Sequence, residues 1–246
     1  MAKIKVIING AQGKMGQATI KAVLNEKDLE LAGEVDINTP DLTSTIKNTK
    51  ADVVIDFTHP SVAMKNIRTI LNNKANGVIG TTGISEKDLK EIESLCKKNK
   101  VNCLVVPNFA IGAVLMMKFA KEAAHYMPEV EIIELHHDKK ADAPSGTAIK
   151  TAQLIIKEHG SLKKPKKKEI ETLKGSRGGE LGGIRIHSVR LQGFVAHQEV
   201  IFGGLGQTLR IKHDTINRES FMPGVIMAIR KAKKIKGLVY GLENIL

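Results

Sequence analysis

The first half of the chain alternates short, mostly apolar runs with amphipathic segments. Short apolar runs are typical of strands that are buried on both faces, and hydrophobic residues three and four positions apart are typical of helices packed on one side. The predicted strands cover residues 3–9, 29–35, 52–57, 77–80 and 101–106, and the predicted helices cover 18–24, 61–72 and 86–98. This alternation predicts an α/β fold with a doubly wound, Rossmann-like parallel sheet.

The second half of the chain shows a different pattern. Segments 184–190, 196–201 and 207–212 alternate polar and apolar residues with a period of two, as strands do, and glycine-rich turns separate them. Residues 131–135 form a further alternating strand. The predicted helices of this half cover 113–126, 147–159 and 219–233. We therefore expect a second, α+β domain with a mostly antiparallel sheet.

A glycine-rich turn, Gly10-Ala11-Gln12-Gly13-Lys14-Met15-Gly16, joins the first strand to the first helix. Glycines at such a turn let the backbone approach a pyrophosphate, which then lies at the helix N-terminus. The spacing is GxxGxxG, not the usual GxGxxG, so the motif by itself is a weak signal. The turn predicts a dinucleotide site only when further residues support it.

Asp36 gives that support, because it ends the second strand twenty residues after Gly16. A dinucleotide site needs an acid there to bind the adenosine ribose hydroxyls. The simpler alternative is an acid that caps a turn before Pro40. With the glycine turn, Asp36 predicts a nicotinamide or flavin dinucleotide site. The neighbouring Ile37 is not basic, which favours NADH over NADPH.

The residues directly after the other predicted strands are further candidates, since ligands bind at the carboxyl ends of parallel strands. The turn Gly80-Thr81-Thr82-Gly83 offers hydroxyl and N–H groups for a carboxamide, or is an ordinary strand-to-helix turn. Pro107-Asn108-Phe109 follows the last strand of this half. His59 stands before Pro60, which makes it a turn residue rather than a catalyst.

Residues 134–148, ELHHDKKADAPSGTA, combine titratable groups with a helix start. His136 and His137 come at the end of a strand, and Lys139 and Lys140 follow. The segment 142–147 then opens a helix, in which proline suits the first turn and serine suits the cap. Because helix N-termini attract anions, this stretch predicts a site for a carboxylate-bearing substrate with a proton donor.

Two other interpretations of residues 134–148 are a polar strand end before an ordinary capped helix, and a zinc site. Zinc sites need three or four ligands, and the sequence has no HxxxH or CxxC set to complete one. We therefore predict no metal.

Together these motifs resemble the 4-hydroxy-tetrahydrodipicolinate reductase family, formerly called dihydrodipicolinate reductase, over essentially the whole chain. The run from Glu134 to Ala148 is the specific signal, whereas the glycine turn is not. The other matching residues are Asp36, Gly80 to Gly83, Asn108, Phe109, Arg177 to Gly179, Gly183, Ile184, His187, Arg190, Gly193 and His197.

The resemblance implies reduction of a cyclic dicarboxylate by NADH or NADPH in diaminopimelate and lysine biosynthesis. His136 would be the proton donor or acceptor and Lys140 the proton donor to the substrate. His137, Gly146 and Thr147 would bind the substrate. The cofactor would be lined by Gly10, Ala11, Gln12, Gly13, Lys14, Met15, Asp36, Gly80, Thr81, Thr82, Val106, Pro107, Asn108 and Phe109.

The resemblance also implies the domain organisation. Residues 1–107 and 217–246 would form the dinucleotide-binding domain, to which the C-terminal helix returns. Residues 108–216 would form a substrate-binding and oligomerisation domain, through which the family assembles as a homotetramer.

The net charge is +12, from 38 Lys and Arg against 26 Asp and Glu, and much of the excess lies in the run Lys163–Lys168. That run is either a solvated loop or an electrostatic attractor of anionic ligands. With 3% aromatic residues and no Trp, base-stacking platforms for nucleic acid are poorly supplied. The remaining alternatives to an enzyme are a non-catalytic dinucleotide-sensing module and a nucleic-acid binder. The first does not need the histidines and lysines of residues 134–148, and the second does not need the glycine turn.

No apolar run approaches the ~20 residues of a membrane-spanning helix, and the N-terminal residues do not read as a secretory signal. Cys96 and Cys103 lack metal-site spacing, and so few cysteines are typical of a reducing compartment. The sequence therefore predicts a cytoplasmic protein without a membrane partner.

Overall fold

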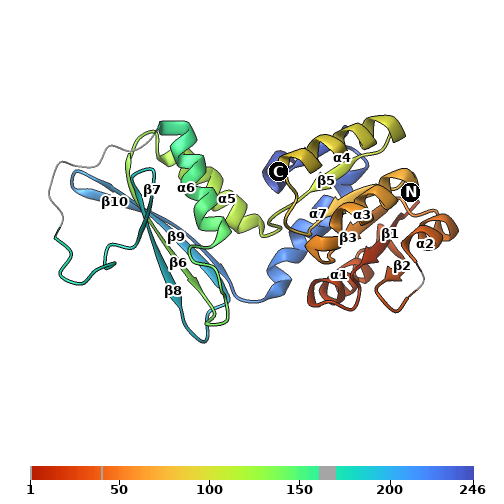
Figure 1. Ribbon diagram of the computed structural model, residues 1–246, viewed down its shortest axis with the longest axis horizontal. Coiled ribbons are helices and arrows are strands. Elements are labelled where there is room, and N and C mark those ends of the chain that lie inside the picture. The colour runs from red at the N-terminus through yellow and green to blue at the C-terminus, as the bar shows by residue number, and fades with distance from the viewer. Residues whose placement is uncertain (1, 40, 161–169) are drawn as a thin grey trace. The chain divides into compact units, whose positions relative to one another are not determined.

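The computed structural model describes residues 2–39, 41–160 and 170–246 (Figure 1). The chain divides into two compact units. The first unit comprises Met1–Ile111 and Arg218–Leu246, and the second comprises Gly112–Asn217. The sequence placed these boundaries after residues 107 and 216. The run Lys163–Lys168 lies outside the described residues.

The first unit is built on a six-stranded sheet in the order β11-β5-β4-β3-β1-β2, and all of its strand pairs are parallel. The strands are β1 (Ile4–Asn9), β2 (Leu29–Val35), β3 (Val53–Asp56), β4 (Asn76–Ile79), β5 (Cys103–Val105) and β11 (Leu238–Tyr240). The predicted Rossmann-like sheet is therefore confirmed, although β11 was not predicted. Val6, Ile7 and Ile8 of β1 are fully buried, as apolar runs in central parallel strands require.

Helices of the first unit pack in two groups. They are α1 (Lys14–Leu24), α2 (Leu42–Thr49), α3 (Pro60–Asn72), α4 (Glu86–Asn99) and α7 (Met222–Ala232). α1 packs against α7, while α3 packs against α2 and α4. Right-handed crossovers put such groups on opposite faces of a parallel sheet. The predicted helix 219–233 is divided into the 3-10 turn η1 (Arg218–Phe221) and α7, and a second 3-10 turn, η2 (Leu242–Asn244), lies near the C-terminus.

α2 is a helix that the sequence analysis missed. Its N-cap is Asp41, whose carboxylate accepts hydrogen bonds from the N–H groups of Thr43 (2.8 Å) and Ser44 (3.1 Å). Leu42 and Ile46, four residues apart, are its buried side chains. A capping aspartate before two apolar residues at helical spacing is a recognisable signal, but the helix is short.

The second unit is built on a five-stranded sheet in the order β10-β9-β6-β8-β7. Its strands are β6 (Glu129–His136), β7 (Gly179–Leu181), β8 (Ile184–Arg190), β9 (Ala196–Gly204) and β10 (Gln207–Thr215). The sheet is mixed, since β6 and β8 are parallel and the other pairs are antiparallel. The parallel pair arises because the chain passes through α6 (Gly146–His159) between these strands.

The two faces of this sheet differ. α6 packs against β6 and β7, and α5 (Ile111–Ala123) runs beside it on the same side (Figure 1). Ile132, Ile186, Val200 and Phe202 are buried on this covered face. The opposite face, which we call the open face, carries half-buried apolar and charged side chains. The open face includes Glu131, Ile133, Leu135, Arg185, His187, Val189, His197, Glu199 and Ile201.

Within the described ranges, the structure has no helix that is both long enough and apolar enough to cross a membrane.

Candidate functional site

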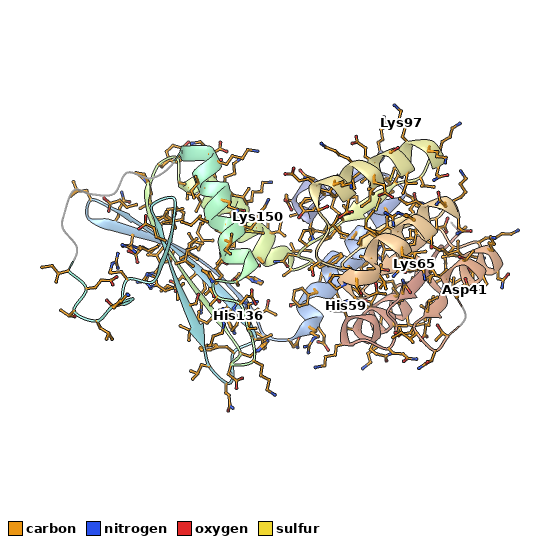
Figure 2. The ribbon with its side chains drawn as sticks, in the orientation of Figure 1. Asp41, His59, Lys65, Lys97, His136 and Lys150 are labelled. Carbon is orange, nitrogen blue, oxygen red and sulfur yellow. The ribbon has the colours of Figure 1, made fainter. Side chains whose placement is uncertain are left out.

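A cavity of about 810 Å³ opens at the carboxyl ends of β1, β2 and β3. The strand order reverses at β1, because β2 and β3 lie on either side of it, and this is the switch point where open α/β sheets bind ligands. Asp41, His59 and Lys65, which are labelled in Figure 2, belong to its wall. The full lining is Asn9, Gly10, Gln12, Gly13, Val35, Asp36, Ile37, Thr39, Asp41, Leu42, Thr43, Phe57, Thr58, His59, Ser61, Val62, Lys65, Asn66 and Thr69.

The glycine turn shapes one wall of this cavity, and its glycines are required by the backbone. Gly10 has φ +86°, and a Cβ there would lie 2.6 Å from the Phe57 carbonyl oxygen. A Cβ at Gly16 would lie 2.1 Å from the Gly10 carbonyl oxygen. Gly13 is the N-cap of α1 and makes no side-chain cap, so the first N–H groups of α1 are available to an anion.

Asp36 closes the cavity beside this turn. Its carboxylate accepts hydrogen bonds from the N–H groups of Gln12 (2.8 Å) and Ile37 (2.8 Å). Its own N–H donates to Thr39 Oγ1 at 2.6 Å. Asp36 thus caps its local turn, as the simpler interpretation describes, and it also lines the cavity, where binding of the ribose hydroxyls stays a prediction.

A buried carboxylate that was not predicted from the sequence holds the loops at this edge of the sheet. Asp56 is fully buried at the end of β3. Its Oδ2 accepts from Nδ2 of Asn9 (2.7 Å) and of Asn66 (2.9 Å). Its Oδ1 accepts from the hydroxyls of Thr58 (2.8 Å) and Thr81 (2.5 Å). One side chain therefore ties together the ends of β1, β3 and β4 with α3.

The remaining predicted cofactor residues of the first unit lie outside the cavity lining. Val106, Phe109, Ala11 and Thr81 are buried, whereas Thr82 is exposed. Gly80 must be a glycine, because a Cβ there would lie 2.2 Å from the Phe57 ring and 2.9 Å from the Phe109 ring. The others are Lys14, Met15, Pro107 and Asn108, of which Asn108 accepts a hydrogen bond from the N–H of Ala110 (2.9 Å).

Gly80 and Val106 nevertheless lie along the same sheet edge as Asp56. The Gly80 N–H donates to the Asp56 carbonyl, and the Val106 N–H donates to the Ile79 carbonyl. Predicted cofactor residues thus follow β1, β2, β4 and β5 at the carboxyl edge of the sheet, where Asp56 ends β3.

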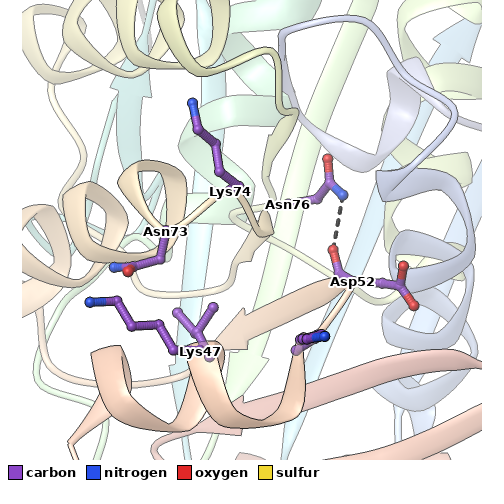
Figure 3. Close-up of a pocket in the computed structure, with 8 residues that line it drawn as sticks. Lys47, Asp52, Asn73, Lys74 and Asn76 are labelled. Atoms are coloured by element: carbon purple, nitrogen blue, oxygen red, sulfur yellow. Dashed lines mark hydrogen bonds between the residues drawn. The ribbon is translucent and has the colours of Figure 1, made fainter.

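A second cavity, of about 420 Å³, lies at the opposite end of this sheet (Figure 3). Lys47, Asp52, Lys74 and Asn76 are among its lining residues. The Lys74 ammonium already donates to the side-chain oxygen of Asn99 at 3.0 Å. Because this cavity borders the amino ends of β3 and β4, it is not the candidate for a nucleotide.

In the second unit, the predicted catalytic histidine is held by a buried carboxylate. Glu134 is fully buried, and its Oε2 lies 2.5 Å from His136 Nδ1. Arg190 forms a bidentate pair with Glu134, with distances of 2.9 and 2.8 Å. Burial opposes ionisation of Glu134, but hydrogen bonds from Arg190, Ser188 and His136 outweigh it and lower the pKa of this carboxyl.

His136 itself is mostly buried, with 14% of its side chain exposed. Burial lowers the pKa of His136 below its usual value, and the hydrogen bond to Glu134 offsets only part of this effect. The positive charges of Lys140 and Arg190 lower the pKa further. Together these effects favour the neutral form of His136, and its Nδ1 faces the Glu134 carboxylate.

Lys140 is held beside the start of α6. Its ammonium donates to Asp142 Oδ1 at 2.7 Å, and 22% of its side chain is exposed. The hydrogen bond to Lys140 is the main cause that lowers the pKa of Asp142. His137 and Lys139, in contrast, are exposed.

The start of α6 has the properties of an anion site. Ser145 is the N-cap and accepts a hydrogen bond from the Ala148 N–H at 3.2 Å. In the described part of the chain, no hydrogen bond uses the N–H groups of Gly146 and Thr147. A Cβ at Gly146 would meet nothing within 4 Å, so packing gives no reason for a glycine there. Pro144 precedes the cap, so its predicted place in the first helical turn was wrong.

Among the described residues, no group of three or more His, Cys, Asp or Glu side chains could hold a metal ion.

Comparisons with known proteins identify the family of this chain. The family profile described as "Dihydrodipicolinate reductase, N-terminus" matches residues 4–109, and "Dihydrodipicolinate reductase, C-terminus" matches residues 112–246. The 4-hydroxy-tetrahydrodipicolinate reductase of Desulfitobacterium hafniense is 48% identical, with 100% of both chains covered. That of Syntrophomonas wolfei is 51% identical, with 99% of both chains covered.

A solved structure has the same fold. The dipicolinate-bound dihydrodipicolinate reductase from Paenisporosarcina sp. TG-14 matches with a TM-score of 0.93 and 47% identity, over 99% of this chain and 100% of that chain. A more distant solved structure, GenD2 from gentamicin A biosynthesis in complex with NAD, shares only the fold, with a TM-score of 0.67 and 9% identity. The resemblance read from the sequence is confirmed, and the chain belongs to the dihydrodipicolinate reductase family of oxidoreductases.

Proposed function

We propose that this chain reduces 4-hydroxy-tetrahydrodipicolinate to tetrahydrodipicolinate, a step of diaminopimelate and lysine biosynthesis, with a hydride from a pyridine nucleotide. The observation that carries this proposal, in a chain of this family, is the cluster of His136, Lys140 and the open start of α6 in one unit. A dicarboxylate needs cations and helix N–H groups, and hydride addition to a C=C–C=N system needs an acid to protonate it.

The chemistry assigns a role to each side chain. Conversion of the 4-hydroxy compound to tetrahydrodipicolinate replaces the 4-hydroxyl group by hydrogen, so water must leave, which gives a C=C bond conjugated with the ring C=N. A hydride added to carbon 4 of this conjugated system shifts electron density to nitrogen, so an acid must deliver a proton. Lys140 supplies that proton in our proposal, and His136 accepts or donates a proton at Nε2. The N–H groups of Gly146 and Thr147, together with His137, bind the substrate carboxylate.

The cofactor binds in our proposal along the row of strand ends in the first unit, and its nicotinamide ring supplies the hydride. The pyrophosphate lies on the glycine turn, and Asp36 accepts the ribose hydroxyls. Asp36 followed by the exposed, apolar Ile37 disfavours a 2′-phosphate, although Lys65 in the cavity wall partly offsets this. We propose that both cofactors are used and that NADH is preferred.

The open face of the second unit supports the homotetramer that we propose. Ile133, Leu135, Val189 and Ile201 lie together on this face, and no helix of the described residues covers them. Around them lie charged side chains, and an uncovered apolar sheet face of this kind is typical of an interface between subunits. The mass of the particle in solution, from light scattering or sedimentation, tests this. We place the enzyme in the cytoplasm, with Cys96 and Cys103 as free, buried thiols.

The test follows NADH absorbance after the protein meets the freshly made condensation product of pyruvate and aspartate semialdehyde. The wild type should oxidise NADH, and a higher kcat/KM for NADH than for NADPH is expected. Lys140→Ala should raise KM for the dicarboxylate and lower kcat by about 10² to 10⁴, because it removes both a counter-ion and a general acid.

Lys139→Ala is the matched control, because the Lys139 side chain is its exposed neighbour, and its kinetics should match the wild type. Near-normal turnover by Lys140→Ala would disprove the role of Lys140. Cofactor binding without oxidation would instead favour a dinucleotide-sensing module.

A further inference from the structure

The feature that the proposed chemistry leaves unexplained is Glu134. It is a fully buried carboxylate, and none of the proposed roles in binding or proton transfer uses it. A buried charge is costly unless it is paired and hydrogen-bonded. Glu134 meets this condition with hydrogen bonds from Arg190, His136, the Ser145 N–H and Ser188.

Two of these bonds reach different parts of the same candidate site. The bond to His136 Nδ1 is 2.5 Å long, and the bond from the Ser145 N–H to Oε1 is 3.1 Å long. Ser145 is the N-cap of α6, so its position determines where the N–H groups of Gly146 and Thr147 point. A single carboxylate therefore sets both the imidazole and the helix start.

The bond to Nδ1 also selects the tautomer. An ionised carboxylate only accepts hydrogen bonds, so Nδ1 of His136 must carry a proton, and Nε2 of the neutral ring keeps its lone pair. Nε2 is then the ring atom that can exchange a proton with a substrate. The opposite tautomer would place a lone pair against the carboxylate.

Arg190 completes the arrangement by joining β8 to the segment before α6. It donates to the Asp142 carbonyl at 2.6 Å and to the Val189 carbonyl at 2.8 Å, besides its two bonds to Glu134. Its Nε is buried without a hydrogen-bond partner among the described residues. Leaving the Nε–H donor unpaired is unfavourable. We infer that the bonds to Glu134 and Asp142 determine where the Arg190 guanidinium lies.

We propose that Glu134, held by Arg190, is a positioning residue of the reductase site, which fixes the Nδ1–H tautomer of His136 and the start of α6 together. This inference rests on the proposed function for its kinetic consequence only. The positioning itself is a property of the protein without substrate, because all of its contacts lie within the second unit.

The first test measures the tautomer in the wild-type protein, where no variant can misfold. ¹⁵N chemical shifts of histidine-labelled protein, with His136 assigned from the signals lost in His136→Asn, report which ring nitrogen is protonated. We expect a neutral His136 with its proton on Nδ1. A proton on Nε2 would overturn the proposal, whether or not the protein reduces the proposed substrate.

The second test compares Glu134→Gln with Glu158→Gln. Glu158 of α6 also bonds a histidine and a cation, His125 (3.1 Å) and Lys121 (2.7 Å), but all three side chains are partly exposed. Glu134→Gln should lower kcat at least tenfold, towards the about 10⁴-fold loss known for removal of an orienting carboxylate in a Ser-His-Asp triad. It should also shift the pH profile of kcat and raise KM for the dicarboxylate, because His136 and the start of α6 both change.

Glu158→Gln should retain wild-type kinetics. Combining Glu134→Gln with His136→Asn separates the effect on kcat, which acts through His136, from the effect on KM, which acts through the start of α6. In that background Glu134→Gln should leave kcat unchanged and still raise KM. A folded Glu134→Gln protein with the wild-type kcat and pH profile would overturn the proposal. So would a loss of activity in which the pH profile and the His136 tautomer stay as in the wild type, since that indicates a merely structural role.

Discussion

The two units of this chain each contain a fully buried carboxylate near the carboxyl end of a strand, and the two are satisfied differently. Asp56 in the first unit accepts hydrogen bonds from the neutral side chains of Asn9, Asn66, Thr58 and Thr81. Glu134 in the second unit pairs with the Arg190 guanidinium and His136. The neutral donors around Asp56 only hold the loops in place. The histidine beside Glu134 can titrate, so the carboxylate also changes its pKa.

The difference shows what each unit requires. The first unit must hold backbone close to a ligand, so its carboxylate and its glycines act on loop geometry. The second unit must present groups that exchange protons, so its carboxylate acts on a histidine. We therefore expect substitutions of Asp56 mainly to lower the free energy of unfolding, and substitutions of Glu134 mainly to lower kcat.

The largest effect on stability is expected for Asp56→Ala. Removal of the shared acceptor leaves several buried donors without a partner, at a cost of about 3–5 kcal/mol in the free energy of unfolding. Asp56→Asn keeps one acceptor oxygen and should lose less. Urea unfolding followed by circular dichroism measures both. If Asp56→Ala unfolded within about 1 kcal/mol of the wild type, the supporting role of this carboxylate would be refuted.

The next largest effect on stability is expected from one of two glycine substitutions, Gly16→Ala, whereas the other, Gly146→Ala, should not destabilise the fold. Gly16→Ala places a methyl group 2.1 Å from the Gly10 carbonyl oxygen, whereas Gly146→Ala meets nothing within 4 Å. We expect Gly16→Ala to destabilise the fold by about 1–3 kcal/mol and to weaken NADH binding.

Gly146→Ala should leave stability unchanged or raise it by up to about 1 kcal/mol, since alanine is the better helix former. It should raise KM for the dicarboxylate about tenfold, because the added methyl group obstructs the approach of the carboxylate to the N–H groups, which weakens about one hydrogen bond to a charged group. Calorimetry and steady-state kinetics on both variants measure these effects. An unchanged KM in Gly146→Ala would remove the start of α6 from the substrate site.

The smallest effect is the response of stability to mild acid, and we expect it in the second unit. Burial lowers the pKa of His136 and of His213 in the folded protein. The folded state then binds fewer protons than the unfolded state, so this stability is present above an unfolded pKa of about 6.5 and is lost as pH falls through the folded values.

Unfolding at a series of pH values from 7.5 to 5.5 checks the prediction, and the decrease should be about 1 kcal/mol or less. The double variant His136→Gln, His213→Gln should flatten the dependence. An equally steep decrease in that variant would mean that other groups are responsible.

Much of the fold could be predicted because its signals are local. Buried strands appear as apolar runs, and the glycine turn is recognisable because residues such as Gly10 adopt a backbone that other residues avoid. The segment 134–148 was recognisable for the same reason, since its histidines, lysines and helix cap are neighbours in sequence. α2 and β11 were missed because both are short and depend on packing in the first unit.

The carboxylate networks could not be predicted. Asp56 lies 47 residues from Asn9 and 25 from Thr81, and Glu134 lies 56 residues from Arg190. No periodicity connects such partners, and each residue by itself resembles any polar group at the end of a strand.

The sequence by itself therefore determined the parallel sheet, the glycine turn, the run of residues 134–148 and the family. Only the tertiary structure decided that β6 and β8 are parallel and that Asp56 and Glu134 are buried. It also decided which ring nitrogen of His136 faces a carboxylate. The physical reason is that hydrogen bonds and ion pairs depend on distances of about 3 Å between groups far apart in the chain, and folding alone brings those groups together.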